Sequence, residues 1–378
     1  MKVVISGVNL VEGGPLKVLQ DAISALAKKD NIELICLVNN RELFNQLFKE
    51  NIIFLEFPLV KKNWLFRCFF EYIYCWFLSK KIKPDIWLAM HDMTPYLYAA
   101  AKIKQFVYCH NPSPAYKATF KDFRFDKKFF LFSKLYKLLY KLNIKANCAV
   151  ICQQKWIAEL FANEYGANQV YVARPNTSKV ERIIANESIH QCVNSDKIKI
   201  FYPALPRTFK NFELLLDAMV IIESKYMSSL SKKIELILTL DNRNDSAYVK
   251  WLYDKYGSLS SVNFVGRLTR EQVNYFYQSS DLVVFPSKLE TWGLPIVEAK
   301  EFKKPIFLAD LPYAYETLGI YDKAKFFDVN DPMALAELII GFVNGNLVYD
   351  QTSSSDDNDI FPDWDSLVTK LLDHKNKC

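Results

Sequence analysis

The fold is indicated most directly by the stretch Pro286-Ser-Lys-Leu-Glu-Thr-Trp-Gly-Leu-Pro-Ile-Val-Glu-Ala-Lys-Glu-Phe-Lys-Lys-Pro305. It follows a short apolar run, Leu282-Val-Val-Phe285, whose length and flanking turn residues are typical of a buried parallel strand. A proline then opens an apolar helical period, which predicts a helix over Pro295–Phe302. The apolar run and the stretch after it are therefore expected to form a strand, a loop and a helix, with Glu290 in the loop and Glu298 in the helix.

Strands and helices alternate along the rest of the chain, which predicts parallel sheets with helices on both faces. In the first half, the expected strands are Lys2–Ser6, Ile32–Val38, Ile52–Phe57, Asp85–Ala89, Gln105–Cys109 and Cys148–Cys152, with helices Pro15–Lys28, Glu42–Lys49 and Trp64–Ser79. From Lys197 the pattern restarts, with strands Ile198–Tyr202, Ile234–Thr239, Val262–Val265 and Leu282–Phe285 and helices Asn211–Lys225, Ser246–Tyr256, Arg270–Gln278 and Pro295–Phe302.

The restart predicts two doubly wound, Rossmann-like α/β domains, as expected for 378 residues, which exceed one ordinary hydrophobic core. We expect a first domain over 1–190 and a second over 197–345, with the boundary in the polar stretch Asn186–Asp196. Residues 346–378 are expected to form an acidic linker, Asp350–Asp359, and a terminal helix, Trp364–Leu372.

Composition favours a cytoplasmic protein. The eight cysteines show no C-x-x-C spacing, so we expect buried thiols in a reducing compartment. The first seven residues hold a short strand and not the long apolar region of a signal peptide. The longest apolar candidate for a membrane span, Trp64–Leu78, is interrupted by Arg67 and Glu71 and falls short of the roughly twenty residues required. No transmembrane helix is therefore expected.

The stretch around the two glutamates resembles the E-x7-E segment of the large glycosyl transferases group 1 family with the GT-B fold. The shared pattern is Pro-Ser-x-x-Glu-x-x-Gly-Leu-Pro-x-x-Glu-Ala, beginning at Pro286. Two glutamates eight positions apart would alone indicate a solvated helix, but the fixed residues around them make the pattern specific. The resemblance implies two Rossmann-like domains facing across a cleft, a terminal helix returning to the first domain, and retaining transfer from nucleoside-diphosphate sugars.

The resemblance also assigns a donor site in the second domain. It implies that Glu290 lies beside the donor sugar and that Glu298 accepts hydrogen bonds from the donor ribose. Carboxylates suit hydroxyl groups because they offer acceptors only. The turn between the two glutamates and a Gly-x-Leu loop expected near the nucleotide base complete the donor-binding set, which is Thr291, Trp292, Gly293, Leu294, Gly266 and Arg267.

Two further places suit the donor diphosphate. Gly13 and Gly14 follow the first strand and open a helix, where backbone N–H groups and the helix dipole favour an anion. Lys210 and Arg207 follow the strand Ile198–Tyr202 and could offset the charge of a departing diphosphate. The family's Gly-Arg pair is missing, since a Pro-Ala pair stands in its place, so the role of Arg207 stays open. The alternatives are a tight strand-to-helix turn and two solvated cations.

His110 ends an apolar strand and precedes a segment held extended by two prolines. The resemblance implies that it hydrogen-bonds the donor sugar, which makes it a candidate catalytic residue with Glu290, Lys210 and Arg207. A loop histidine that is simply exposed or caps a neighbour is the alternative. No pattern calls for a metal or another cofactor, because cations and helix dipoles can meet the charge of the leaving group.

A basic helix is expected over Phe129–Lys145. Lys134, Lys137, Lys141 and Lys145 recur at helical spacing beside a stripe of leucines (Leu131, Leu135, Leu138 and Leu142). This pattern indicates attraction to an anionic membrane surface. The alternative is a helix that packs its leucines on its own sheet. Nucleic acid is not an expected partner, because the basic patch accompanies a sugar-nucleotide pattern.

The sequence thus predicts a retaining glycosyltransferase that moves a sugar from a nucleoside diphosphate to a hydroxyl of a glycan or lipid-linked acceptor, in bacterial surface polysaccharide assembly such as that of lipopolysaccharide. The alternatives are a sugar-nucleotide epimerase of the same fold and a catalytically silent sugar-binding subunit. A glycosidase would need two carboxylates flanking one bond, roughly 5 to 9.5 Å apart. The residues do not name the base, the donor sugar or the acceptor.

Overall fold

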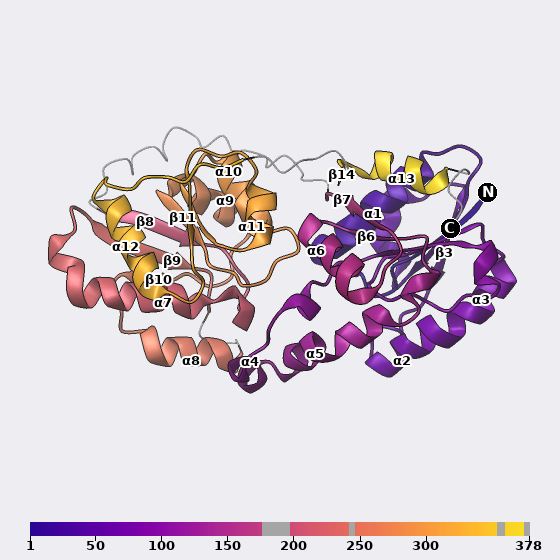
Figure 1. Cartoon of the computed structure of the whole chain (residues 1–378), viewed down its shortest axis with the longest axis horizontal. Helices are drawn as coiled ribbons and strands as arrows, with labels where there is room; N and C mark the ends of the chain where they lie inside the picture. Colours follow the sequence, from indigo (N-terminus) through magenta and orange to yellow (C-terminus); the bar gives the residue numbers. More distant parts are fainter. Residues whose placement is uncertain (176–196, 242–245, 354–359, 374–378) are drawn as a thin grey trace. The chain divides into compact units, whose positions relative to one another are not determined.

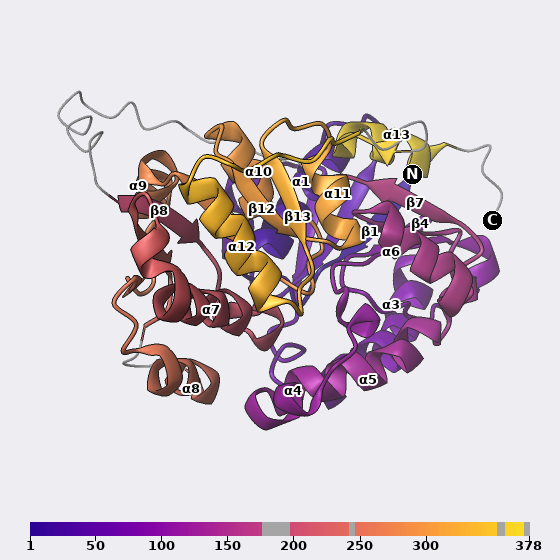
Figure 2. The ribbon, with the colours of Figure 1, turned by 60° about the vertical axis from the view of Figure 1, so that its left-hand side comes forward.

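The computed structural model describes residues 1–175, 197–241, 246–353 and 360–373. They form two compact α/β units, whose elements are labelled in Figure 1 and seen from another side in Figure 2. Unit 1 comprises Met1–Ala115, Phe132–Thr177 and Asp357–Cys378, and unit 2 comprises Tyr116–Leu131 and Ser178–Asp356. The expected first domain, 1–190, includes residues 116–131, which the structure groups with unit 2. The expected boundary at Asn186–Asp196 lies outside the described residues.

Unit 1 is built on a parallel eight-stranded sheet in the order β14-β7-β6-β5-β4-β1-β2-β3. On the central strand, Val4 lies opposite Ile35 on one side and Trp87 on the other. The strands are β1 (Lys2–Ser6), β2 (Glu33–Val38), β3 (Ile52–Glu56), β4 (Ile86–Ala89), β5 (Lys104–Tyr108), β6 (Ala149–Cys152), β7 (Val170–Ala173) and β14 (Ile360–Phe361).

Helices cover both faces of this sheet because its strands are apolar on both sides. One face packs against α1 (Gly13–Ala27) and α13 (Trp364–Leu372), and the 3-10 segment η1 (Arg41–Leu47) joins the same core. The other face packs against α2 (Trp64–Phe69), the π-helical segment η2 (Phe70–Tyr74), α3 (Cys75–Ile82), α5 (Lys127–Lys141) and α6 (Lys155–Leu160) with its π-helical end η6 (Phe161–Tyr165).

The C-terminal segment belongs to unit 1. Ile360 on β14 pairs with Val172 on β7, so the segment adds the edge strand of the sheet. The ring of Trp364, at the start of α13, lies 5.2 Å from the ring of Tyr108 on β5. The terminal helix is thus part of the unit 1 core.

Unit 2 is built on a parallel six-stranded sheet in the order β10-β9-β8-β11-β12-β13. Neighbouring side chains of β8 pack on opposite faces of this sheet. Phe201 stacks on Phe276 of α9, and Tyr202 contacts Phe212 of α7. The strands are β8 (Lys197–Tyr202), β9 (Lys233–Leu238), β10 (Val262–Phe264), β11 (Leu282–Phe285), β12 (Ile306–Ala309) and β13 (Ala324–Phe327). The helices are α4 (Phe120–Phe125), α7 (Phe212–Ile221), α8 (Ala247–Tyr256), α9 (Arg270–Ser279), α10 (Leu294–Glu301), α11 (Pro312–Leu318) and α12 (Pro332–Val343).

These two parallel sheets confirm the predicted class of two Rossmann-like α/β domains. Two predictions of helices need correction. The helix expected over Trp64–Ser79 contains the π-helical segment η2, which shifts the phase of its apolar face. The basic helix expected over Phe129–Lys145 ends at Lys141, because Asn143 has the left-handed φ of 61°. Lys145 therefore lies in a separate 3-10 turn, off the helical register of the other lysines.

The cysteines also differ in part from expectation. Cys36, Cys75, Cys109 and Cys152 are buried free thiols, and Cys68 is a half-buried one. Cys148 is disulfide-bonded, so the prediction of thiols throughout is wrong there. Over the described residues, no helix is long and apolar enough to cross a membrane.

Candidate functional site

The loops after β8 and β11 meet at the carboxyl edge of the unit 2 sheet, the edge where ligands of open parallel sheets bind. Lys210 ends the short 3-10 segment after β8, and Glu290 lies in the loop after β11. The ammonium group of Lys210 pairs with Oε1 of Glu290, and both side chains are mostly buried. The same ammonium group lies 5.6 Å from the ring centroids of Phe209 and Phe285. Two residues 80 positions apart thus form one ion pair.

Hydrogen bonds fix the backbone under this ion pair. The Tyr202 hydroxyl donates to the Lys210 carbonyl at 2.7 Å, and the Lys288 amide donates to the Phe209 carbonyl at 2.7 Å. The Tyr313 hydroxyl donates to the Ser287 carbonyl at 2.6 Å. Burial raises the pKa of Tyr202 and of Tyr313, and the nearby Glu290 carboxylate adds to both shifts. The two phenols are therefore fixed donors that hold the loops in place.

Glu298 lies on α10, one helical turn beyond the loop, and pairs with a different cation. Nη1 of Arg270, the first residue of α9, lies 2.5 Å from its Oε1. Gly293 begins α10 with a φ of +76°, and a Cβ there would lie 3.1 Å from Cδ1 of Ile296. Both the backbone conformation and the close approach favour glycine at this turn. The sequence reasoning missed Arg270. The available signal was its position as the first residue of α9, directly after the Thr269 capping box.

The remaining predicted donor residues occupy the same edge. Gly266 and Arg267 follow β10, where the Gly266 amide donates to the Leu240 carbonyl at 3.0 Å. Thr291, Trp292 and Leu294 lie in or just after the Glu290 loop, which Thr317 ties down by a hydrogen bond to the Trp292 carbonyl. The structure thus groups these residues around the loops that carry Glu290 and Glu298.

Arg207 is placed differently from Lys210. Its guanidinium is 59% exposed, and its Nη1 lies 3.4 Å from Oδ2 of Asp126 in the segment after α4. Lys210 makes its ion pair with Glu290 instead. The sequence left Lys210 and Arg207 as joint candidates for offsetting the charge of the diphosphate. In the structure they pair with different carboxylates.

In unit 1, the predicted phosphate turn lies at the carboxyl end of β1. Gly13 has a φ of +66° and is the first residue of α1, and no atom would meet a Cβ on Gly14. The Glu12 side chain at the cap position accepts no hydrogen bond from this turn. The first amides of α1 therefore lack a side-chain cap and keep the polarity that favours an anion.

His110 follows β5 at the same edge of unit 1. Its backbone amide donates to Oδ1 of Asp92 at 2.6 Å, and its ring lies 4.7 Å from the ring of Tyr108. Burial lowers the pKa of His110 to about 4, with an opposing contribution from a hydrogen bond to the Met90 backbone. The imidazole is therefore neutral near pH 7 and suited to hydrogen bonding a hydroxyl group.

Next to it lies a buried charged cluster that sequence reasoning missed, made of Arg67, Glu71 and His91. Glu71 is fully buried, and its Oε1 lies 3.2 Å from Nε2 of His91. The guanidinium of Arg67 donates to the His91 carbonyl and lies 3.1 Å from the Tyr136 hydroxyl. Burial raises the pKa of Glu71 to about 8, against the influence of Arg67, and lowers the pKa of His91. The available signal was the i, i+4 pair of charges inside an otherwise apolar helix.

The basic helix α5 exposes both its lysines and its leucines. Lys134, Lys137 and Lys141 are exposed, and so are the leucines beside them, with Leu138 68% accessible. The buried residues are Ser133, Tyr136 and Tyr140. The alternative that the leucines pack on the sheet is therefore wrong, because tyrosines fill that place.

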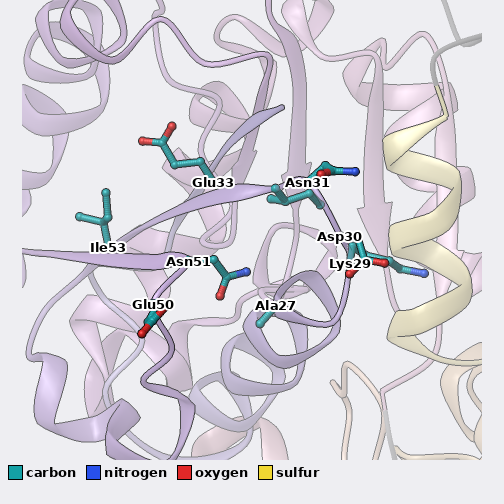
Figure 3. A pocket seen from close by; sticks show the side chains of 9 residues that line it. Ala27, Lys29, Asp30, Asn31, Glu33, Glu50, Asn51 and Ile53 are labelled. Carbon is teal, nitrogen blue, oxygen red and sulfur yellow. The ribbon is translucent and has the colours of Figure 1, made fainter.

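A shallow pocket lies at the opposite, amino edge of the unit 1 sheet (Figure 3). Its lining comes from the turns that precede β2 and β3 and includes Asn31, Glu33, Glu50 and Asn51. It contains none of the residues singled out from the sequence. Nowhere in the described part of the chain do three or more His, Cys, Asp or Glu side chains group as metal ligands would.

Residues 183–355 match the model of the family described as "Glycosyl transferases group 1". This match identifies a glycosyltransferase domain in the part of the chain that holds Glu290, Glu298 and Lys210. A search of curated protein sequences finds no match.

Solved structures show the same fold at low sequence identity. A glycosyltransferase from Rickettsia africae ESF-5 is 16% identical, covers 99% of each chain and has a TM-score of 0.64. WaaG, a glycosyltransferase involved in lipopolysaccharide biosynthesis, is 14% identical with a TM-score of 0.61 over 90% of each chain. Anabaena HepE, in complex with UDP and glucose, is 15% identical with a TM-score of 0.56 and covers 99% of this chain and 96% of its own. The likeness confirms the GT-B fold.

Proposed function

We propose that this chain, which carries a group 1 glycosyltransferase domain, is a retaining enzyme that transfers a sugar from a nucleoside diphosphate to an acceptor hydroxyl. The observation that carries the proposal is the Glu290–Lys210 ion pair at the carboxyl edge of unit 2. It places a carboxylate and a cation at the edge where a nucleotide sugar would bind. The complexes of HepE with UDP and with UDP-glucose support a nucleotide-sugar donor and make UDP-sugars the first to test.

In this proposal the bond between the sugar C1 and the diphosphate oxygen breaks, and the diphosphate leaves with the electron pair. The acceptor oxygen bonds C1 from the same face, and its proton passes to a diphosphate oxygen. Lys210 offsets the charge of the leaving group, Glu290 orients the sugar, and Glu298 receives the ribose hydroxyls. The polar Gly13-Gly14 turn and the neutral His110 complete the proposed donor-facing residues. No step requires a metal, so activity should persist with EDTA.

For the acceptor, we propose a glycan or lipid-linked glycan of bacterial surface polysaccharide assembly. The likeness to WaaG and to WaaB, a lipopolysaccharide outer core galactosyltransferase, supports this class. The exposed lysines of α5 support a contact with anionic lipid, worth about 1 kcal/mol per lysine near the surface. Replacing Lys134, Lys137 and Lys141 by Glu is expected to remove the salt-sensitive part of the binding to anionic vesicles. Unchanged binding would overturn the electrostatic account.

A donor panel tests the function. The protein is incubated with UDP-, GDP-, ADP- and dTDP-sugars and a lipid-linked acceptor, and the products are analysed by mass spectrometry and NMR. The expected result is release of one nucleoside diphosphate together with a glycoside that keeps the anomeric configuration of the donor. An inverted product would refute retention. An isomerised donor would indicate an epimerase, and nucleotide binding without turnover would indicate a silent sugar-binding subunit.

A further inference from the structure

A second exposed apolar surface lies on the helical stretch formed by α2, η2 and α3. Its outward residues are large and apolar: Leu65 is 81% exposed, Phe69 52% and Phe77 59%, and Phe66 and Ile73 are about half exposed. The opposite side of the stretch supplies Phe70, Cys75 and Leu78 to the core of unit 1. Four of them recur every four residues and form one stripe along the stretch: Leu65, Phe69, Ile73 and Phe77. Exposed apolar patches of this kind mark interaction sites.

The charges around the stripe have one sign. Between Phe57 and Pro84 the sequence holds a single carboxylate, Glu71, and its side chain is fully buried. The exposed charges of this segment are lysines at both ends of the stripe: Lys61, Lys62, Lys80, Lys81 and Lys83. Among these, Lys61 lies 3.9 Å from Glu12, a long surface pair. An apolar centre with lysines at both ends fits an anionic surface.

The helix that begins the stripe, α2, packs on α5. The ring of Trp64 lies 5.7 Å from that of Phe132, and Arg67 contacts Tyr136, so α2 packs directly on α5 (Figure 1). The outward side of α5 there adds Leu135 and Leu138 among its lysines. Two helices that pack against each other therefore both expose apolar side chains.

We propose that the α2–α3 stripe inserts into the interfacial layer of an anionic lipid bilayer and anchors unit 1 to the membrane surface. Aromatic and aliphatic side chains flanked by lysines are the composition of helices that lie in the interface plane. Protein interfaces, in contrast, are depleted in lysine. The inference extends the electrostatic contact proposed for α5 by adding apolar insertion, which salt does not screen.

Co-sedimentation of the full chain with vesicles separates the two contributions. Vesicles of phosphatidylcholine alone, and of phosphatidylcholine with phosphatidylglycerol, are compared at low and high salt. The variant Leu65→Ser/Phe69→Ser/Phe77→Ser is compared with Ile320→Ser/Val348→Ser, which removes similarly exposed apolar side chains from unit 2. Sugar transfer to a water-soluble acceptor is measured in parallel, so loss of anchoring and loss of catalysis are distinguished. Leu65→Ser alone provides a second variant with minimal risk to folding.

We expect wild-type binding to anionic vesicles to persist in part at high salt. The triple variant should lose at least tenfold in this salt-resistant partitioning, Leu65→Ser about threefold, and the unit 2 control nothing. The lysine-to-glutamate variant of α5 should lose the salt-sensitive part. Salt-resistant binding that survives the triple variant, or that is missing from the wild type, would overturn the proposal. So would a change from oligomer to monomer on light scattering with unchanged vesicle binding, which would assign the stripe to a second copy of the chain.

Discussion

The carboxyl edges of the two sheets hold their charges in opposite ways. In unit 2, Glu298 pairs with an exposed arginine, and the Glu290–Lys210 pair keeps some access to solvent. In unit 1, Glu71 and His91 are almost completely buried, and burial shifts the pKa of each toward its neutral form. The same topological position thus carries charges that a ligand can engage in one unit and, in the other, titratable groups that burial holds mainly in their neutral forms.

This difference predicts different consequences of mutation. Removing one member of a buried charged cluster leaves its partners desolvated and unpaired, so stability should fall. Removing one member of a pair that meets a ligand should change binding or turnover and leave stability nearly intact. The predictions below test this contrast in order of expected effect.

Arg67→Met should have the largest effect on stability. It removes the cation that contacts the His91 carbonyl and lies among Glu71 and Asp92, so above pH 8, where Glu71 is ionised, the free energy of unfolding should fall by about 3 to 5 kcal/mol. The loss should be greater at pH 9 than at pH 5. Because burial raises the pKa of Glu71 to about 8, its contribution to stability is present at acid pH and is lost as pH rises through 8, more so without Arg67. Denaturant unfolding at several pH values measures this.

The matched control is Arg41→Met in the same unit. Arg41 is 66% exposed and lies 3.9 Å from Glu56, so its removal should cost less than about 1 kcal/mol at any pH. An equal loss in both variants, or a loss at Arg67 that does not grow with pH, would contradict a buried cluster that destabilises when Glu71 ionises.

Lys210→Ala should have the largest effect on catalysis. If Lys210 stabilises the leaving diphosphate, turnover should fall by about 10² to 10³-fold, which corresponds to about 3 to 4 kcal/mol. Steady-state kinetics with the donor found in the panel measures kcat. Lys255→Ala, which removes an exposed lysine paired with Asp217 at 3.2 Å, is the control and should leave kcat unchanged. A Lys210 variant with near-normal turnover would move the leaving-group role to another cation.

Many elements of the two units could be predicted from local sequence, and others could not. Short apolar runs bounded by turns predicted β1 and β11 to the residue, because burial and chain reversal leave local marks. The elements between α10 and β14, which include β12 and α12, were not predicted. The run Ile306–Ala309 is as short as β11, but it lacks a following motif such as Gly-Leu-Pro, and four residues alone do not show a period. The turn around Gly293 was placed correctly because glycine and proline fix local backbone conformation.

The charged pairs could not be predicted in the same way. Arg270 and Glu298 are 28 residues apart, and Arg67 and His91 are 24 apart, so only the packing of separate elements brings them together. The phase of α2–α3 also depends on a π-helical turn, which an assumed 3.6-residue period does not reveal. The outward position of the leucines on α5 could not be predicted either, because the buried positions of this helix are occupied by tyrosines.

Glu298→Ala should weaken binding of the donor nucleotide by about 1 to 3 kcal/mol, roughly 5- to 150-fold, because charged hydrogen bonds to the ribose would be lost. Titration calorimetry with the nucleotide measures the affinity. Glu337→Ala on α12 removes an exposed carboxylate elsewhere in unit 2 and should change nothing. Unchanged affinity in Glu298→Ala would refute the ribose assignment and leave Glu298 as part of a structural ion pair.

Arg270→Gln should have the smallest effect, and it shows whether the Arg270–Glu298 pair competes with a ligand or holds the carboxylate in place. Arg270 is 56% exposed, so its pair with Glu298 is worth at most about 1 kcal/mol. A ribose that hydrogen-bonds Glu298 must share the carboxylate with Arg270 or displace the arginine. Removing Arg270 should therefore tighten nucleotide binding by up to about fivefold. The double variant with Glu298→Ala should then bind no better than Glu298→Ala alone. Weaker binding in Arg270→Gln would instead mean that Arg270 positions the carboxylate. Glu298 would then be held by the fold, as Glu71 is in unit 1.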